Sequence, residues 1–220
     1  VMTEEQLRGI ADFAVEKDII VIADEIYEKL IYSKDKKHIS IASFNQEIYD
    51  RTITVNGVSK SYAMTGWRIG YTASPLKIAK LMASMQSHMT SNPNSIAQKA
   101  ALAAIAGPQD CVEQMREQFE KRRDYIYERV VKMPYVKTIK PEGAFYLFID
   151  FSGTYQKAYK GETLSSAAQI GAMLLDEKLL AVVPCADFGM PDHIRFSYAT
   201  SIENITKGMD RLEEFLAEIK

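Results

Sequence analysis

The chain has 220 residues, of which 47% are hydrophobic and 25% charged, a balance typical of a globular protein with one or two buried cores. Its 27 basic and 29 acidic residues give a formal net charge of −2, so no basic surface for nucleic acid or anionic lipid is predicted. No apolar run reaches the roughly 18 residues of a membrane span, and no signal-peptide pattern is present, so we expect a cytoplasmic protein.

The first half of the chain alternates between predicted helices and strands. Capping-box spacing at Thr3–Gln6 opens a predicted helix, and the apolar, β-branched run within 18–25 (DIIVIADE) follows it. Such a run predicts a strand buried on both faces of a parallel sheet. Further elements are expected as strands at 52–56 and 67–73 and as helices at 75–89 and 95–106. This alternation predicts an α/β fold.

A long amphipathic helix over 109–132 is expected to connect two domains, covering 1–108 and 133–220. Its buried side is marked by four apolar residues, Val112, Met115, Phe119 and Ile126. The region beyond it is predicted to be a packed α+β unit. Its strands are expected at 138–141, 143–150, 181–184 and 193–199, and its helices at 167–175 and 202–216.

Cysteine and histidine give no metal-binding framework in this sequence. Cys111 and Cys185 are far apart and form no C-x-x-C motif, which suits a reducing compartment. His38, His88 and His193 are isolated along the chain. We therefore expect no metal centre.

The segment GVSKSYAMTGWRIG, residues 57–70, carries the most specific chemical pattern. Lys60 follows a predicted strand in a turn of small and apolar residues. Partial desolvation in such a turn favours the neutral amine, which is the form that attacks an aldehyde. Arg68 offers a planar cationic fork for phosphate or carboxylate. Asp24 ends an upstream strand, and ligands of parallel sheets bind at such strand ends. Together they indicate a pocket for an anionic, carbonyl-bearing cofactor, pyridoxal phosphate.

Each of these residues also has a simpler explanation when taken alone. Asp24 fits a helix cap or a surface acid, Lys60 a solvated lysine, and Arg68 an arginine whose stem packs on a neighbouring ring. An apolar strand ending in Asp-Glu also occurs in proteins that bind Mg²⁺ and nucleotide. That reading requires a G-x-x-x-x-G-K-[ST] loop, which the sequence lacks.

Taken together, the residues resemble the class I (fold-type I) pyridoxal-phosphate aminotransferases of the aspartate aminotransferase type. Residues 57–70 fit that family's lysine-site pattern, and ADEIYEKLIY (23–32) resembles its pyridine-binding strand. PEGAFYLFID (141–150) and HIRFSYATS (193–201) resemble its small-domain segments. The resemblance covers the whole chain and implies the carboxyl-terminal half of such an enzyme. The implied fold is part of a mostly parallel-sheet large domain, joined by a long helix to an α+β small domain.

The resemblance implies a role for five residues. Lys60 would form the Schiff base with the cofactor and move a proton during the reaction. Asp24 would pair with the pyridinium nitrogen, Tyr27 would bind the phenolic oxygen, and Arg68 would hold the phosphate. Arg195 would bind the α-carboxylate of the substrate. The implied substrates are an L-amino acid and a 2-oxo acid, as in exchange between aspartate and 2-oxoglutarate.

Two departures from the family pattern qualify this picture. Many members have a phosphate-binding serine where this chain has Gly57, and Ser59 is the substitute candidate. Members are also longer, and the part expected before Val1 supplies a phosphate loop, a ring-stacking aromatic and an asparagine. The isolated chain is therefore expected to be inactive and to self-associate through open sheet edges.

The implied parent is a homodimer in which the loop Thr90–Ser95 reaches the neighbouring site. Three alternatives stay open, one of which is the Mg²⁺ and nucleotide site described above. Another fold-type I enzyme, such as a carbon-sulfur lyase, would share Lys60, Asp24 and Arg68. A non-catalytic structural or binding role would leave Lys60 without a cofactor.

Overall fold

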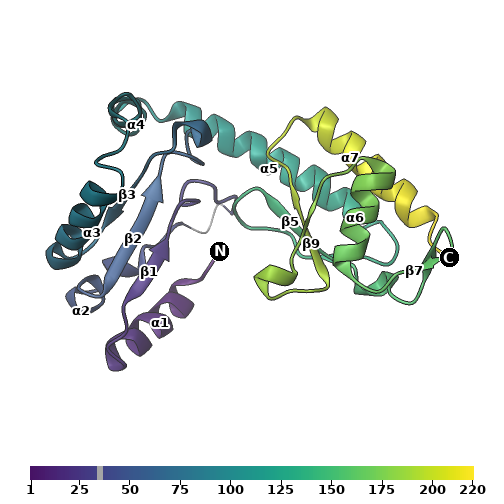
Figure 1. Cartoon of the computed structure of the whole chain (residues 1–220), viewed down its shortest axis with the longest axis horizontal. Coiled ribbons are helices and arrows are strands. Elements are labelled where there is room, and N and C mark those ends of the chain that lie inside the picture. The colour runs from purple at the N-terminus through teal and green to yellow at the C-terminus, as the bar shows by residue number, and fades with distance from the viewer. Residues whose placement is uncertain (34–36) are drawn as a thin grey trace. The chain divides into compact units, whose positions relative to one another are not determined.

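The computed structural model describes residues 1–33 and 37–220. The chain divides into two compact units, Val1–Arg116 and Glu117–Lys220, and the boundary falls within one long helix, α5 (Asp110–Val130) (Figure 1). Within the described ranges, no helix combines the length and the apolarity needed to cross a bilayer.

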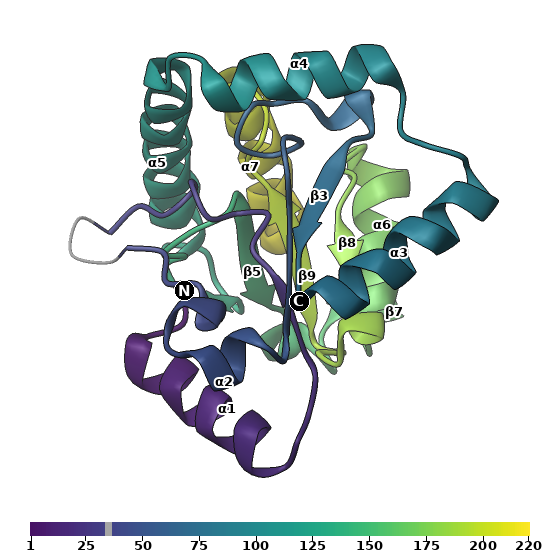
Figure 2. The same ribbon diagram turned by 90° about the vertical axis from the view of Figure 1, so that its left-hand side faces the viewer.

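The first unit is built on a small mixed sheet. Its strands are β1 (Val21–Asp24), β2 (Thr52–Gly57) and β3 (Gly70–Ala73), in that order across the sheet. β1 runs parallel to β2, and β3 runs antiparallel to β2. The other regular elements of this unit are helices α1 (Glu4–Glu16), α2 (Gln46–Tyr49), α3 (Leu76–Met89), α4 (Ser95–Ala106) and the start of α5. Helix α1 lies on one side of the strands and α3 on the other (Figure 2).

Helix α1 begins where the capping box predicts. The Thr3 side chain accepts a hydrogen bond from the Gln6 amide, and the Gln6 side chain accepts one from the Thr3 amide. Ala11 and Ala14 on this helix are buried in a cluster with Ile41 and Ile48. The helix is therefore held by its cap and by one apolar face.

Two details of the expected sheet are wrong. β1 is not buried on both faces, because its odd-numbered residues pack toward α1 while Ile22 is 71% exposed. The third strand begins at Gly70 rather than at Trp67, since a 3-10 turn occupies Thr65–Trp67 and Arg68 has a left-handed backbone.

The second unit is a packed α+β structure around a four-stranded sheet. The strands of this sheet are β4 (Lys137–Thr138), β5 (Tyr146–Asp150), β8 (Val183–Pro184) and β9 (His193–Ser197). They lie in the order β4-β5-β9-β8, and all neighbouring strands are antiparallel. The sequence patterns did not predict a separate hairpin of β6 (Ala158–Tyr159) and β7 (Glu162–Thr163). Its helices are α6 (Ala167–Lys178), α7 (Ile202–Ala217) and the end of α5.

The two faces of this second sheet differ in character. Alternate residues of β5 and β9 are buried in the core: Leu147, Ile149, Ile194 and Phe196. The intervening residues are only half-buried: Tyr146, Phe148, Asp150, His193 and Arg195. One face therefore packs against apolar side chains, and the other presents aromatic and charged groups.

A close backbone approach joins the ends of β2 and β3. Gly57 pairs with Gly70, and a β-carbon placed on Gly57 would lie 3.1 Å from the Gly70 α-carbon and 3.3 Å from Ile26 Cδ1. Those distances are shorter than ordinary van der Waals contact. The structure thus gives a physical reason for glycine at position 57.

We expect Gly57→Ser to lower the free energy of unfolding by about 1 to 2 kcal/mol, because the added side chain forces β2 and β3 apart. Urea unfolding followed by the fluorescence of Trp67, the single tryptophan, measures the change in this unit. Gly66→Ser is the matched control, since a β-carbon on Gly66 meets no atom within 4 Å. Equal unfolding midpoints for the two variants would contradict this reading of the approach.

Candidate functional site

Strand register brings three of the predicted cofactor residues to one edge of the first sheet. Asp24 is the last residue of β1 and pairs with Val55, two residues before β2 ends. Lys60 lies three residues beyond β2. Arg68 lies two residues before β3, which starts at that same edge because it runs antiparallel to β2. This edge is the carboxyl end of the parallel pair, where open α/β sheets bind ligands.

Lys60 is held in the turn that follows β2. The Tyr62 amide donates to the Val58 carbonyl at 3.2 Å, and the Ala63 amide donates to the Lys60 carbonyl at 3.4 Å. Val58 is buried, which anchors the turn, while the Lys60 side chain is half-buried. The Lys60 ammonium lies 5.8 Å from the centre of the Tyr27 ring, so these two predicted site residues meet.

Asp24 and Tyr27 are positioned by the turn that follows β1. The Asp24 carboxylate is exposed, and its Oδ1 accepts a hydrogen bond from the Ile26 amide at 3.2 Å. The Glu25 amide donates to the Val55 carbonyl at 2.8 Å, which extends the pairing with β2 by one residue. The Leu30 amide donates to the Tyr27 carbonyl at 2.9 Å. The carboxylate therefore retains acceptor capacity for a cationic ring nitrogen.

Arg68 has an unusual backbone for a residue with a side chain. Its φ of 51° and ψ of 49° place it in the left-handed region, and its Nη1 donates to the Thr65 carbonyl at 2.8 Å. Its side chain is exposed. Strained conformations of this kind cluster at ligand sites, where they aim a side chain that the regular strand would direct elsewhere.

An open pocket of about 580 Å³ adjoins Arg68 within this unit. Its walls come from the 60s turn and the start of α4: Ala63, Gly66, Trp67, Arg68, Asn94 and Ala97. Lys60, Asp24 and Tyr27 do not line it. Asn94 caps α4 by accepting hydrogen bonds from the Ile96 and Ala97 amides.

The donor set at this edge fits pyridoxal phosphate. A lysine amine can bond to its aldehyde carbon, a carboxylate can pair with its ring nitrogen, a phenol can bind its ring oxygen, and a guanidinium can bind its phosphate. Ser59, next to Lys60, is half-buried and adds a hydroxyl. Every one of these groups lies in the first unit.

Arg195 lies in the second unit, on the half-buried face of its sheet. It pairs with Phe148 on β5 and with Val183 on β8. The guanidinium carbon lies 4.6 Å from the centre of the Tyr146 ring. Burial raises the pKa of the nearby Cys185 thiol, although the Arg195 charge opposes that shift, so the thiol is neutral at pH 7 and does not neutralise the arginine.

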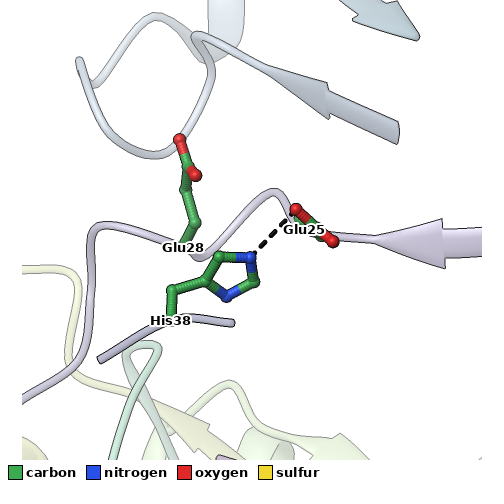
Figure 3. A group of neighbouring side chains, drawn as sticks. All are labelled: Glu25, Glu28 and His38. Atoms are coloured by element: carbon green, nitrogen blue, oxygen red, sulfur yellow. Dashed lines mark hydrogen bonds and ion pairs between the residues drawn. The ribbon is translucent and has the colours of Figure 1, made fainter. Parts of the chain in front are cut away.

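One contact near the site was not predicted. His38 Nε2 lies 2.9 Å from Glu25 Oε2, and the Glu25 side chain is only 9% exposed, so His38, which is isolated along the sequence, has a carboxylate partner in space (Figure 3). No local pattern links two residues 13 positions apart.

Glu28 joins this pair in space, and the ligand atoms of the three side chains lie within 4.8 Å of one another. Acidic groups of this kind are common at protein surfaces without a metal ion, so the arrangement carries no metal assignment. Within this group, the hydrogen bond between His38 and Glu25 holds His38 next to the end of β1.

Comparison with known proteins supports a family assignment. The family model for aminotransferases of class I and II matches residues 1–212. Aspartate aminotransferase of Geobacillus stearothermophilus is 44% identical over 216 residues, which are 98% of this chain and 54% of that protein. A probable aspartate/prephenate aminotransferase of Aquifex aeolicus is 46% identical, over 100% of this chain and 54% of its own length. The chain thus spans about half the length of these relatives.

Solved structures agree with this result. The aspartate aminotransferase of Rhizobium meliloti superposes with a TM-score of 0.95 at 33% identity, covering 100% of this chain and 55% of that one. An aromatic aminotransferase from Pyrococcus horikoshii gives a TM-score of 0.90 at 40% identity, covering 99% and 56%. This α/β chain is therefore a member of the class I and II aminotransferase family.

Proposed function

We propose that this chain supplies half of the active site of a pyridoxal-phosphate-dependent aminotransferase. The reaction moves an amino group between an L-amino acid and a 2-oxo acid. The observation that carries the proposal is the placement of Lys60, Asp24 and Arg68 at one sheet edge, with Tyr27 beside the lysine. Membership of the aminotransferase family supports it.

Lys60 carries the central chemistry in this proposal. Bound pyridoxal phosphate supplies an electron sink that stabilises negative charge at the substrate α-carbon. The Lys60 amine would hold the cofactor through its aldehyde carbon. When the substrate takes its place there, Lys60 Nζ would be free to accept the proton of the substrate α-carbon as a general base.

The other residues of the edge hold and tune the cofactor. Asp24 keeps the ring nitrogen protonated, because its carboxylate favours the cationic form of a nitrogen that it faces. Tyr27 donates its phenol to the ring oxygen. Arg68 binds the phosphate, and Ser59 provides a hydroxyl in place of the serine that Gly57 replaces.

Arg195 is proposed to bind the α-carboxylate of the substrate with its planar fork. An aspartate and 2-oxoglutarate pair is the proposed substrate class, supported by the names of the relatives from Geobacillus and Aquifex. Residues 1–108 are proposed to belong to the cofactor-binding domain and residues 133–220 to form the small domain. The helix over residues 109–132 is proposed to connect these two domains. Three further features stay predictions: a homodimeric parent, a loop Thr90–Ser95 that reaches the neighbouring subunit's site, and a cytoplasmic location.

We expect pyridoxal phosphate to label one lysine of this chain. After addition of the cofactor and reduction with borohydride, peptide mapping should find the label on Lys60, because its amine is held in a turn beside Tyr27. Lys60→Ala should remove the label. Lys99→Ala is the matched control and should keep it, since Lys99 is an exposed lysine of α4.

Label spread over many surface lysines would sink the proposal for this chain and favour a non-catalytic role. A carbon-sulfur lyase would be favoured by a different pair of results. Lys60 would carry the label, and the longer protein would release pyruvate and sulfide from cysteine without transferring an amino group. The 220 residues alone are proposed to show no steady-state transamination. A measurable rate from this chain would overturn that part.

Arg68→Gly should separate cofactor binding from stability. Glycine adopts the left-handed backbone without the cost of about 1 kcal/mol that a side chain brings, which offsets the lost hydrogen bond to Thr65. We expect a nearly unchanged urea midpoint and a pyridoxal phosphate dissociation constant raised about tenfold or more. An unchanged dissociation constant would show that Arg68 does not hold the phosphate.

A further inference from the structure

Two aromatic rings lie over the guanidinium of Arg195. Its central carbon is 4.6 Å from the centre of the Tyr146 ring and 5.1 Å from that of Phe188. Both distances fall within the range of cation–π attraction. Among residues 1–33 and 37–220, no carboxylate pairs with this guanidinium and no hydrogen bond engages its nitrogens. The rings are therefore its immediate partners.

The two rings come from different elements. Arg195 pairs with Phe148, so Tyr146, two residues away on β5, is its diagonal neighbour on the same face of the sheet. Phe188 comes from a tight turn between β8 and β9, outside the sheet. The sheet therefore fixes one ring contact, and a separate structure brings the second.

The turn that carries Phe188 is well defined. The Phe188 and Met190 amides both donate to the Cys185 carbonyl, at 3.0 and 3.1 Å, and the Cys185 amide donates to the His193 carbonyl at 2.9 Å. Gly189 closes the turn with a φ of 77°, a conformation that favours glycine. The backbone thus holds Phe188 in one place.

Packing of the core does not account for Phe188. Its side chain is 62% exposed, so burial in the core does not hold the ring where it lies. The guanidinium of Arg195 is the ring contact that the structure gives it. An exposed ring on a rigid turn beside an arginine without an acidic partner indicates a positioning role.

We propose that Phe188, with Tyr146, positions Arg195 for the substrate carboxylate. This inference rests on the proposed function, in which Arg195 binds that carboxylate. Two rings within cation–π distance limit where the guanidinium can move, while its N–H donors, which lie in its own plane, stay available to a planar carboxylate. A guanidinium restrained in this way loses less side-chain freedom when it binds the carboxylate.

The expected effect is modest and measurable. A cation–π contact at a partly exposed site is worth a factor of about 2 to 5 in an equilibrium constant. Loss of the Phe188 ring should therefore weaken carboxylate binding by about that factor. Because the side chain is largely exposed, its replacement should leave the fold intact.

The test uses the ¹⁵N-labelled chain and succinate as a carboxylate probe, with no cofactor present. The Nε–Hε resonance of Arg195, assigned by its loss in Arg195→Lys, reports both the ring stacking and the binding of succinate. In the unaltered chain, succinate should shift this resonance in a saturable way. Phe188→Leu should remove the Phe188 part of the ring-current shift, leaving the part from Tyr146, and should raise the succinate dissociation constant about threefold. Phe188→Trp should keep the ring-current shift and the dissociation constant within twofold of the unaltered chain.

Leucine retains apolar volume but not the ring, so wild-type behaviour of Phe188→Leu would overturn the proposal in favour of simple packing. Absence of any succinate response in the unaltered chain would also overturn it. Neither result depends on Lys60. If Lys60 labels and Arg195 does not respond, this inference fails alone. If Arg195 responds and Lys60 does not label, the proposed function fails, and what stands is the positioning of Arg195 by Phe188 for a carboxylate ligand.

Discussion

The parallel pairing of β1 with β2 is the constraint on which the proposed cofactor site depends. It sets Asp24 beside Val55, and so brings the ends of both strands to the same edge. A shift of one residue would turn the Asp24 side chain to the other face of the sheet. The Glu25 amide donates a hydrogen bond to the Val55 carbonyl, which extends the same pairing by one residue, to the start of the turn that contains Tyr27. The chemistry of the edge is thus a consequence of backbone pairing.

The segment between β2 and β3 places Lys60 and Arg68 at the edge that this register defines. Close approach of Gly57 and Gly70 lets the two strands meet, and the left-handed backbone of Arg68 turns the chain back into β3. Both features limit what sequence is tolerated here. The absence of a serine at position 57 is, on this account, a steric matter.

Sequence patterns predicted most of the helices and strands, because caps and apolar periodicity act locally. Thr3 with Gln6 and the apolar run before Asp24 are examples. The patterns failed where long-range contacts decide. The exposure of Ile22 depends on what covers the sheet, the backbone of Arg68 on the turn before β3, and the contact of His38 with Glu25 on a fold-level approach. The ring of Phe188 over Arg195 likewise has no local signal.

The most direct test of the account is a crystal structure of this chain after reaction with pyridoxal phosphate and reduction with borohydride. We expect density continuous from Lys60 Nζ to the cofactor, with the ring nitrogen within hydrogen-bond distance of Asp24 and the phosphate at Arg68. A cofactor attached elsewhere, or one at Lys60 whose ring nitrogen and phosphate point away from Asp24 and Arg68, would contradict the central claim that this sheet edge is the cofactor site.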